Sequence, residues 1–215
     1  MKIEAGGDTI ELLPQRAVYW PAQRLLLIAD IHFGKAASFR ALGMPVPHGT
    51  TTDNLLRLDG LLAQREIAHI LFLGDFLHAK AAHADATLAA LRQWRARWHR
   101  LQLTLVRGNH DSRAGDPPPD LEVAIVDEPW RIGPYAFCHH PQYVDGAFVF
   151  SGHIHPVFHL RARGDAVRLP CFLFDHGRAI LPAFGAFTGG HAVQPEAGER
   201  VFLAADDSVW SLPPR

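Results

Sequence analysis

The chain has 215 residues, of which 48% are hydrophobic and 20% charged, and its formal net charge at pH 7 is −1. This composition supplies a sizeable core and excludes a disordered chain, and the near-neutral charge gives no whole-molecule attraction to nucleic acid. Two cysteines, Cys138 and Cys171, are too few for a disulfide framework. No apolar run reaches the roughly 20 residues of a membrane span, and residues 1–11 show no signal peptide. We therefore expect a single cytoplasmic domain over residues 1–215.

The first half of the chain alternates predicted strands and helices. Apolar runs at residues 25–29 and 69–73 predict buried strands, and the alternation of apolar and polar residues over 101–106 predicts a third strand. One helix is predicted from 51 to about 66, and a second begins at Asp85 and continues to Trp98 with apolar residues at helical spacing. This order is typical of a parallel sheet with crossover helices.

The second half of the chain is predicted to contain many short strands and few helices. These strands indicate a second, largely antiparallel or mixed sheet, which would bury its apolar face against the first sheet. We expect an α/β protein, a four-layer αββα sandwich in which two mixed sheets pack face to face and helices lie outside. The predicted strands of this half cover residues 123–126, 135–138, 147–150, 157–162, 166–169, 171–174 and 201–204.

Five of the predicted strands are followed by polar residues that can bind a metal ion, and the chain contains 14 histidines, the commonest metal ligand. In open sheets with crossover helices, sites collect at the carboxyl ends of the strands, so these segments can meet in one crevice. Glycine precedes three of the segments and permits a close approach of the backbone. The candidate metal ligands are Asp30, His32, Asp75, Asn109, His139, His153 and His155.

Two carboxylates, one amide and four imidazoles are too many ligands for one ion but suit two divalent ions with a bridging carboxylate. The charge of two such ions exceeds that of Asp30 and Asp75, so a centre with a bridging hydroxide keeps a small positive charge. Such a centre attracts a phosphate anion and can hold the attacking and leaving oxygens of an in-line displacement. The pattern therefore predicts hydrolysis of a phosphate ester.

The five segments, taken in order over residues 25–155, form one composite pattern. It consists of Asp30-x-His32, Gly74-Asp75, Gly108-Asn109-His110-Asp111, His139 and Gly152-His153-x-His155. This pattern resembles that of the calcineurin-like metallophosphoesterase superfamily. The resemblance implies the fold of that superfamily and a binuclear centre with a metal-bridging hydroxide as nucleophile. It implies manganese as the preferred metal, although the ligand types also permit iron, cobalt or zinc.

The resemblance also implies a role for each position. One ion would be held by Asp30, His32 and His155 and the other by Asn109, His139 and His153, with Asp75 as the bridge.

His110 is the implied catalytic residue. It would face the scissile phosphate, stabilise its charge and protonate the leaving oxygen, and Asp111 would orient it. The family often has glycine where this chain has His140, which leaves two candidates for the lone histidine ligand. His139 is preferred because it directly follows the predicted strand.

Loop segments at 29–36, 43–47, 138–141 and 181–184 resemble the ligase-associated PdeM subgroup of this superfamily. This narrower resemblance implies a manganese-dependent phosphodiesterase and DNA endonuclease of the bacterial DNA damage response, grouped with a DNA ligase, an exonuclease and a helicase. We expect an open site that takes flexible or single-stranded DNA. The alternatives are a phosphodiesterase or pyrophosphatase acting on a small nucleotide and a non-catalytic scaffold that binds repair proteins.

Several further side chains have two interpretations. The basic ones near the ligands either contact substrate phosphates or lie on a solvated surface, and two histidines after Asp75 can line the rim of the site. Segment 184–190 can cover the site or a partner surface. The arginines of the helix at 85–98 are expected to form its solvated face rather than a nucleic-acid patch. The residues near the ligands are Lys35, Arg40, Arg107, Arg113, His78 and His83.

Overall fold

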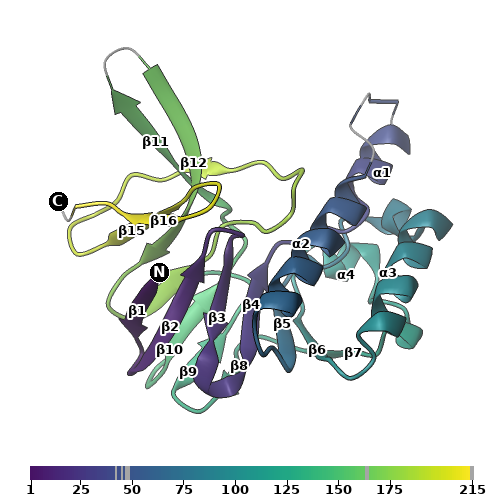
Figure 1. Ribbon diagram of the computed structural model, residues 1–215, viewed down its shortest axis with the longest axis horizontal. Helices are drawn as coiled ribbons and strands as arrows, with labels where there is room; N and C mark the ends of the chain where they lie inside the picture. Colours follow the sequence, from purple (N-terminus) through teal and green to yellow (C-terminus); the bar gives the residue numbers. More distant parts are fainter. Residues whose placement is uncertain (42, 45, 47–48, 163–164, 214–215) are drawn as a thin grey trace.

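Two mixed β-sheets, one of seven strands and one of nine, form the centre of the computed structural model (Figure 1). The structure describes residues 1–41, 43–44, 46, 49–162 and 165–213. Segment 43–47, on which part of the narrower resemblance rests, lies partly outside these residues. The predicted architecture of two mixed sheets is confirmed.

The seven-stranded sheet changes from antiparallel to parallel pairing across its width. Its strands are β1 (Lys2–Ala5), β2 (Asp8–Leu13), β3 (Ala17–Trp20), β4 (Leu25–Ala29), β5 (His69–Leu73), β6 (Gln102–Val106) and β7 (Val123–Val126). They lie side by side in chain order, antiparallel from β1 to β4 and parallel from β4 to β7. The parallel half is the one that the alternation of strands and helices predicts.

Helices cover one face of the parallel half (Figure 1). They are α1 (Lys35–Ala41), α2 (Thr50–Gln64), α3 (Asp85–Arg97) and α4 (Asp111–Ala114), with short 3-10 helices η1 (Pro21–Gln23), η2 (Lys80–His83) and η3 (Pro119–Leu121). The helix predicted from residue 51 begins at Thr50 after Gly49, and no side chain caps it. None of the helices in the described ranges combines the length and the hydropathy that crossing a membrane requires.

The nine-stranded sheet supplies the other half of the sandwich. Its strands are β8 (Trp130–Ile132), β9 (Tyr135–Phe137), β10 (Phe148–Ser151), β11 (Pro156–Ala162), β12 (Asp165–Phe174), β13 (Arg178–Ile180), β14 (His191–Ala192), β15 (Arg200–Ala204) and β16 (Val209–Ser211). The strands β9 and β10 are parallel neighbours in this mixed sheet. The two strands predicted at 166–169 and 171–174 are one strand, β12. Pro170 is tolerated because β12 changes partner there, from β11 to β13 and β15.

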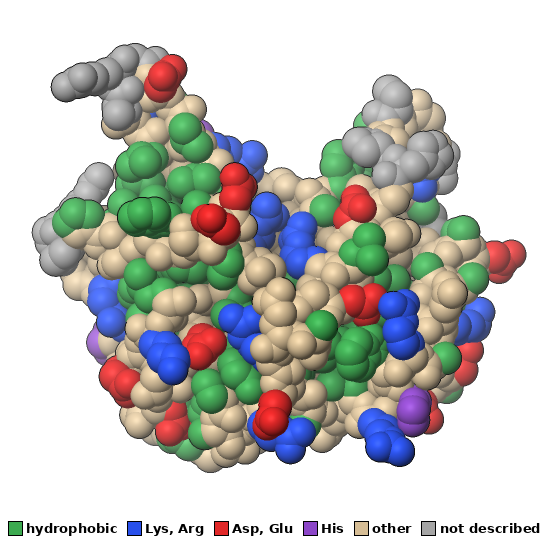
Figure 2. Space-filling model, in the orientation of Figure 1, with side chains coloured by type: hydrophobic (Ala, Val, Ile, Leu, Met, Phe, Trp, Pro, Cys, Tyr) green, Lys and Arg blue, Asp and Glu red, His purple; other side chains and the backbone are tan. Residues whose placement is uncertain are grey.

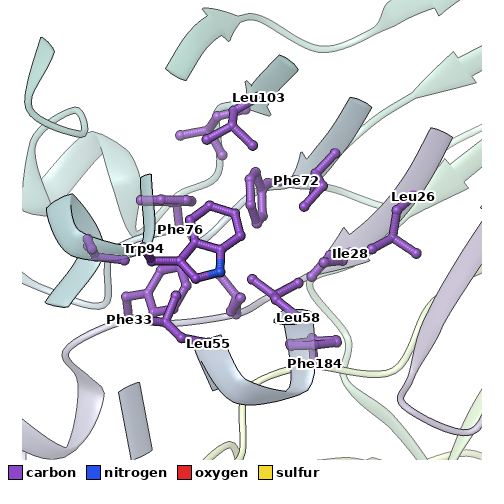
Figure 3. Close-up of a cluster of buried hydrophobic side chains, with 14 of the residues drawn as sticks. Leu26, Ile28, Phe33, Leu55, Leu58, Phe72, Phe76, Trp94, Leu103 and Phe184 are labelled. Carbon is purple, nitrogen blue, oxygen red and sulfur yellow. The ribbon is translucent and has the colours of Figure 1, made fainter. Parts of the chain in front are cut away.

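Strand alternation divides the core into two layers. On one face of the parallel strands, Ile28 and Phe72 pack against Leu58 of α2 and Trp94 of α3 (Figure 3). On the other face, residues such as Leu27 pack against aromatic side chains of the nine-stranded sheet. The two sheets are therefore held face to face by apolar contacts, which fixes the relative position of their strand ends.

Two elements project from the same side of the molecule (Figure 1). The helix α1 begins three residues after His32, and the β11–β12 hairpin begins directly after His155. Figure 2 shows a hollow between these two projections, with lysine or arginine side chains on its floor. The candidate ligands thus lie at the roots of the two projections.

Candidate metal centre

The carboxyl ends of five strands meet where the two sheets face each other. The strands β4, β5 and β6 are adjacent and parallel, and their last residues, Ala29, Leu73 and Val106, are in register. The strands β9 and β10 end beside them from the other sheet. The structure therefore brings all seven predicted ligands together, while their role as ligands stays a prediction.

A first group of ligand atoms comes from Asp30, His32, Asp75 and His155, and these atoms all lie within 4.8 Å of one another. The Nε2 atom of His155 is 3.3 Å from Oδ1 of Asp30, and Nε2 of His32 is 3.6 Å from Oδ2 of Asp75. Asp30 Oδ1, His32 Nε2 and His155 Nε2 are buried and have no hydrogen-bond partner. A buried polar atom without a partner costs about 1–3 kcal/mol, so these converging atoms fit a cation.

A second group is built around His139. Its Nδ1–H donates to the carbonyl of Leu73 at 3.1 Å, which leaves Nε2 free to face the site. This Nε2 lies 2.8 Å from Oδ1 of Asn109 and 3.0 Å from Nδ1 of His153. Separations near 3 Å are those of ligands that hold one cation at about 2.1 Å with right angles between them.

Asp75 lies between the two groups. Its Oδ2 is 3.6 Å from His32 Nε2, and its Oδ1 is 3.6 Å from His139 Nε2. The carboxylate is buried, so both of its oxygens face the interior of the site. This position suits a carboxylate shared by two cations.

Five of the seven candidate ligands adopt left-handed backbone angles. Such angles are uncommon outside glycine, cost of order 1–3 kcal/mol each, and persist only where the surrounding structure imposes them. The residues are Asp30 (φ 52), His32 (φ 49), Asp75 (φ 52), His153 (φ 70) and His155 (φ 53). Their clustering marks this place as the strained, functional part of the backbone.

Burial keeps two of the imidazoles neutral. It lowers the pKa of His32, and the positive charge of Lys35 lowers this pKa further. Burial also lowers the pKa of His153, with the neighbouring His139 and His140 acting in the same direction. A neutral imidazole keeps the lone pair that a cation needs.

The glycines before the ligands are required by close packing. A Cβ atom at Gly74 would collide with the imidazole of His139, and one at Gly152 would collide with Oδ2 of Asp30. Both glycines therefore permit the close approach of the backbone that the sequence predicts.

We expect the substitution Gly152→Ala to displace Asp30 and to reduce the metal content of the protein. Forcing the extra methyl group into this packed site should also lower the free energy of unfolding by about 1–3 kcal/mol. Metal analysis and thermal unfolding measure the two effects. The matched control is Gly60→Ala on the exposed face of α2, where a Cβ meets nothing within 4 Å. This control should stabilise the protein by up to about 1 kcal/mol. Normal metal content in Gly152→Ala would contradict the expectation.

His110 lies at the open side of the centre. Its backbone N–H donates to Oδ1 of Asp75 at 2.9 Å, and its Nε2 lies 3.9 Å from Oδ2 of the same carboxylate. Its Nδ1–H donates to the carbonyl of His78 at 2.8 Å. This bond directs Nε2 of the half-buried ring toward the site.

The expectation that Asp111 orients His110 is wrong. The Asp111 carboxylate accepts the backbone N–H groups of Phe76, Leu77 and Gly108, at 2.9, 3.3 and 2.9 Å. Its side chain thus ties together the loops that follow β5 and β6. Burial raises the pKa of Asp111 to about 6.

The two candidates for the lone histidine ligand have different environments. His139 is fully buried, whereas the side chain of His140 is 45% exposed and its Nδ1 bonds Oε1 of Glu128 at 2.6 Å. Oε2 of Glu128 accepts the backbone N–H groups of His139 and His140 at 2.6 and 2.9 Å. Glu128 therefore positions the histidine pair, a role that no motif in the sequence indicates.

The histidines after Asp75 have different environments. His78 lies at the rim of the site, with Nδ1 3.3 Å from Nδ1 of His32 and its ring stacked on His110 at 4.9 Å between centroids. Burial, assisted by Lys35, lowers the pKa of His78 to about 4. His83 instead bonds the carbonyl of Ala114 at 3.1 Å.

The basic residues also differ in their positions, because some lie near the centre and others form ion pairs on the surface. Lys35 is near enough to the centre for the charges of Asp75 and Asp30 to act on its pKa, which burial lowers. Arg107 forms ion pairs with Asp116 and Asp127, at 3.0 and 3.1 Å, on the surface. Two exposed arginines of α3, Arg92 and Arg97, pair with Asp120 and Asp59, which favours the solvated-face interpretation for these two. Arg95 of the same helix is instead buried and pairs with Glu122, so the interpretation does not hold for it.

Segment 184–190 runs beside the end of β4. Phe184 is fully buried in the core under α2 (Figure 3), and its N–H donates to the carbonyl of Ala29 at 2.8 Å. Phe187 packs edge-on against Phe39 at 5.7 Å between centroids. The segment therefore forms one wall next to the centre, and only one of its two phenylalanines remains partly exposed.

The sandwich of two mixed sheets and the paired ligand groups have the arrangement expected of a binuclear metallohydrolase. The sequence model of the family described as calcineurin-like phosphoesterase matches residues 23–147, and the chain belongs to this family. Its members depend on a binuclear metal centre, and the two ligand groups fit one.

Solved structures provide two further comparisons. The chain is similar to the nuclease MPE of Pseudomonas putida, with 47% identity, a TM-score of 0.88 and 99% of each chain covered. It aligns with a Vps29 double mutant from Entamoeba histolytica with 16% identity and a TM-score of 0.35, over 87% of this chain and 96% of that chain. No curated protein matches the sequence. Together with the family membership, the first comparison identifies the chain as a metal-dependent phosphodiester hydrolase.

Proposed function

We propose that the protein is a manganese-dependent endonuclease that hydrolyses phosphodiester bonds of DNA. The observation that carries this proposal is the pair of ligand groups that lie on either side of the buried Asp75, beside His110. The nuclease activity named for the Pseudomonas putida relative supports the choice of a nucleic acid as substrate. Mixed imidazole and carboxylate ligands accept manganese, and also iron, cobalt or zinc.

The proposed ligand roles follow the two groups. Asp30, His32 and His155 would hold one cation, Asn109, His139 and His153 would hold the other, and Asp75 would be available to both. A pair of divalent cations supplies Lewis-acid activation of a water molecule and neutralises charge on the phosphate.

His110 assists departure of the leaving oxygen. The carbonyl of His78 holds the proton at Nδ1, so Nε2 is the atom that meets the substrate. When Nε2 is protonated, it can donate a hydrogen bond to the phosphate oxygens and transfer its proton to the oxygen that leaves the phosphorus. Lys35, half-buried beside the same carboxylates, adds positive charge at this wall.

The shape of the surface supports a strand-like substrate. The centre lies at the roots of α1 and the β11–β12 hairpin, and Figure 2 shows the hollow between these two projections. A strand lying in this hollow can continue past the cleaved bond, as an endonuclease requires. We further propose that the strand is flexible or single-stranded, because it must descend between the projections to reach buried ligands.

The cellular setting belongs to the same proposal. We place the enzyme in bacterial DNA repair in the cytoplasm, acting with a DNA ligase, an exonuclease and a helicase. The support for this setting is the loop resemblance to the ligase-associated PdeM subgroup described above.

We expect the purified protein to cut circular single-stranded DNA in the presence of Mn²⁺ and to cut a linear duplex more slowly. Gel analysis of the DNA measures both activities. A circular strand has no ends, so its cleavage shows endonuclease action, and the His110→Ala variant prepared in parallel excludes a contaminating nuclease.

Cyclic nucleotides and nucleotide-linked pyrophosphates are the comparison substrates. Rapid hydrolysis of these molecules with no cleavage of either DNA would overturn the assignment to DNA and indicate a small-nucleotide phosphodiesterase or pyrophosphatase.

A further inference from the structure

A second cavity adjoins the candidate metal centre. It has a volume of about 200 Å³ and lies at the base of the β11–β12 hairpin, between this hairpin and residues 183–189. His155, a candidate ligand of the centre, forms part of its wall. Arg16 and Arg168 line the same cavity from the β2–β3 turn and from β12.

Arg16 is a partly buried arginine that lies near a second positive charge. Burial lowers its pKa, and the positive charge of Arg57 on α2 lowers this pKa further. Among the residues that the structure describes, no carboxylate pairs with the Arg16 side chain, and Arg57 donates to the carbonyl of Phe184 at 2.7 Å. Partly buried like charges repel each other and lose hydration, so an anion bound in the cavity beside Arg16 would relieve an unfavourable arrangement.

Arg168 is held at the opposite wall by a specific backbone contact. Its Nη2–H donates to the carbonyl of Gly190 at 3.3 Å. A Cβ atom at position 190 would collide with Arg168 Nη2 and with Val157. The glycine therefore permits the guanidinium to approach the loop and fixes its position over the cavity.

We propose that this cavity binds a second phosphate of the substrate, the neighbour of the phosphate that is cleaved. Two guanidinium groups supply the forked N–H donors that bind phosphate oxygens in pairs. Because His155 belongs to both sites, phosphates in the cavity and at the centre are close enough to be consecutive groups of one strand. The inference rests on the proposed function, since it identifies the substrate as a molecule with at least two phosphates in series.

The test compares inhibitors of the hydrolysis of bis-p-nitrophenyl phosphate, a diester with a single phosphate. Thymidine 3′,5′-bisphosphate should inhibit the Mn²⁺-loaded enzyme about tenfold more strongly than thymidine 5′-monophosphate, because hydrogen bonds between charged groups contribute about 1.5–3 kcal/mol. The ratio of the two inhibition constants is the measured quantity, so it is independent of a change in turnover.

The substitutions Arg16→Ala and Arg168→Ala should each reduce this ratio to near one. Arg168 is exposed on a hairpin, so its variant carries the test if Arg16→Ala fails to fold. The matched control is Arg131→Ala, an exposed arginine of β8 that bonds the carbonyl of Asp145. It should retain the wild-type ratio.

The 5′-phosphorylated dithymidine pTpT distinguishes two sources of the second phosphate. If pTpT and the bisphosphate both inhibit more strongly than the monophosphate, and by the same factor, the cavity takes any second phosphate, including one inside a strand. A gain from the bisphosphate alone indicates a cavity for strand ends.

A wild-type ratio near one, or a ratio that both arginine variants retain, overturns the inference. The proposed function is judged separately by cleavage of circular DNA. Loss of that activity with the ratio intact would leave the phosphate subsite in place and remove DNA as the substrate.

Discussion

The substitution Asp75→Asn is expected to reduce phosphodiester hydrolysis by about 10³-fold or more, because charge stabilisation by metal ions contributes several kcal/mol. The amide keeps the shape of the side chain but removes the negative charge that lies 3.6 Å from both His32 Nε2 and His139 Nε2. Both ligand groups lose their common carboxylate, so the bound metal should also decrease. Metal analysis after gel filtration and initial rates with bis-p-nitrophenyl phosphate measure the two effects.

The control for this variant is Asp127→Asn. Asp127 is an exposed carboxylate that pairs with Arg107 on the surface at 3.1 Å. Exposed ion pairs contribute at most about 1 kcal/mol, so this variant should keep its metal and its activity. If Asp75→Asn retained full metal content, the role of Asp75 as the shared ligand would be wrong.

The substitution His110→Ala is expected to leave the metal content unchanged and to reduce cleavage of DNA by about 10²–10⁴-fold. His110 is not one of the seven candidate ligands, and its Nε2 is free to meet the substrate because Nδ1–H bonds the carbonyl of His78. If His110 donates a proton to the leaving oxygen, the loss should be smaller with bis-p-nitrophenyl phosphate. Its nitrophenolate leaving group needs no proton, whereas the alkoxide of a DNA strand does.

The matched control is His176→Ala, because the side chain of His176 is 87% exposed and lies outside the site. Equal losses on both substrates would assign His110 to charge stabilisation of the phosphate without proton transfer. Near-normal turnover on both substrates would remove His110 from the mechanism.

The position of the site was predictable because strand ends are visible in a sequence. Apolar runs that stop at a polar residue locate Asp30, Asp75 and His139, and adjacent parallel strands bring such residues to one edge. The residues that position the ligands were not predictable in the same way. Glu128 binds two backbone N–H groups, and the carbonyl of His78 orients His110, so neither contact leaves a characteristic residue type at a fixed spacing.

Two features of the fold were also not predicted from the sequence, the N-terminal strands and the position of Arg16. The N-terminal strands β1, β2 and β3 were not among the predicted strands, and they extend the sheet by pairing one after another, with only β3 next to β4. Arg16 joins the second cavity only because the β2–β3 turn lies beside a hairpin more than a hundred residues away. The candidate ligands, in contrast, all lie within a few residues of the end of a strand, namely β4, β5, β6, β9 or β10.

The division of the ligands between the two sheets has a consequence for the cohesion of the molecule. Asp75 follows a strand of the seven-stranded sheet and His139 follows a strand of the nine-stranded sheet, yet their side chains lie 3.6 Å apart. A cation that both residues bind is therefore a crosslink across the seam of the sandwich, and its binding free energy adds to the stability of the folded state. Removing the metal with a chelator should weaken the packing of the two sheets against each other. The supply of metal would then set the stability of the enzyme as well as its activity.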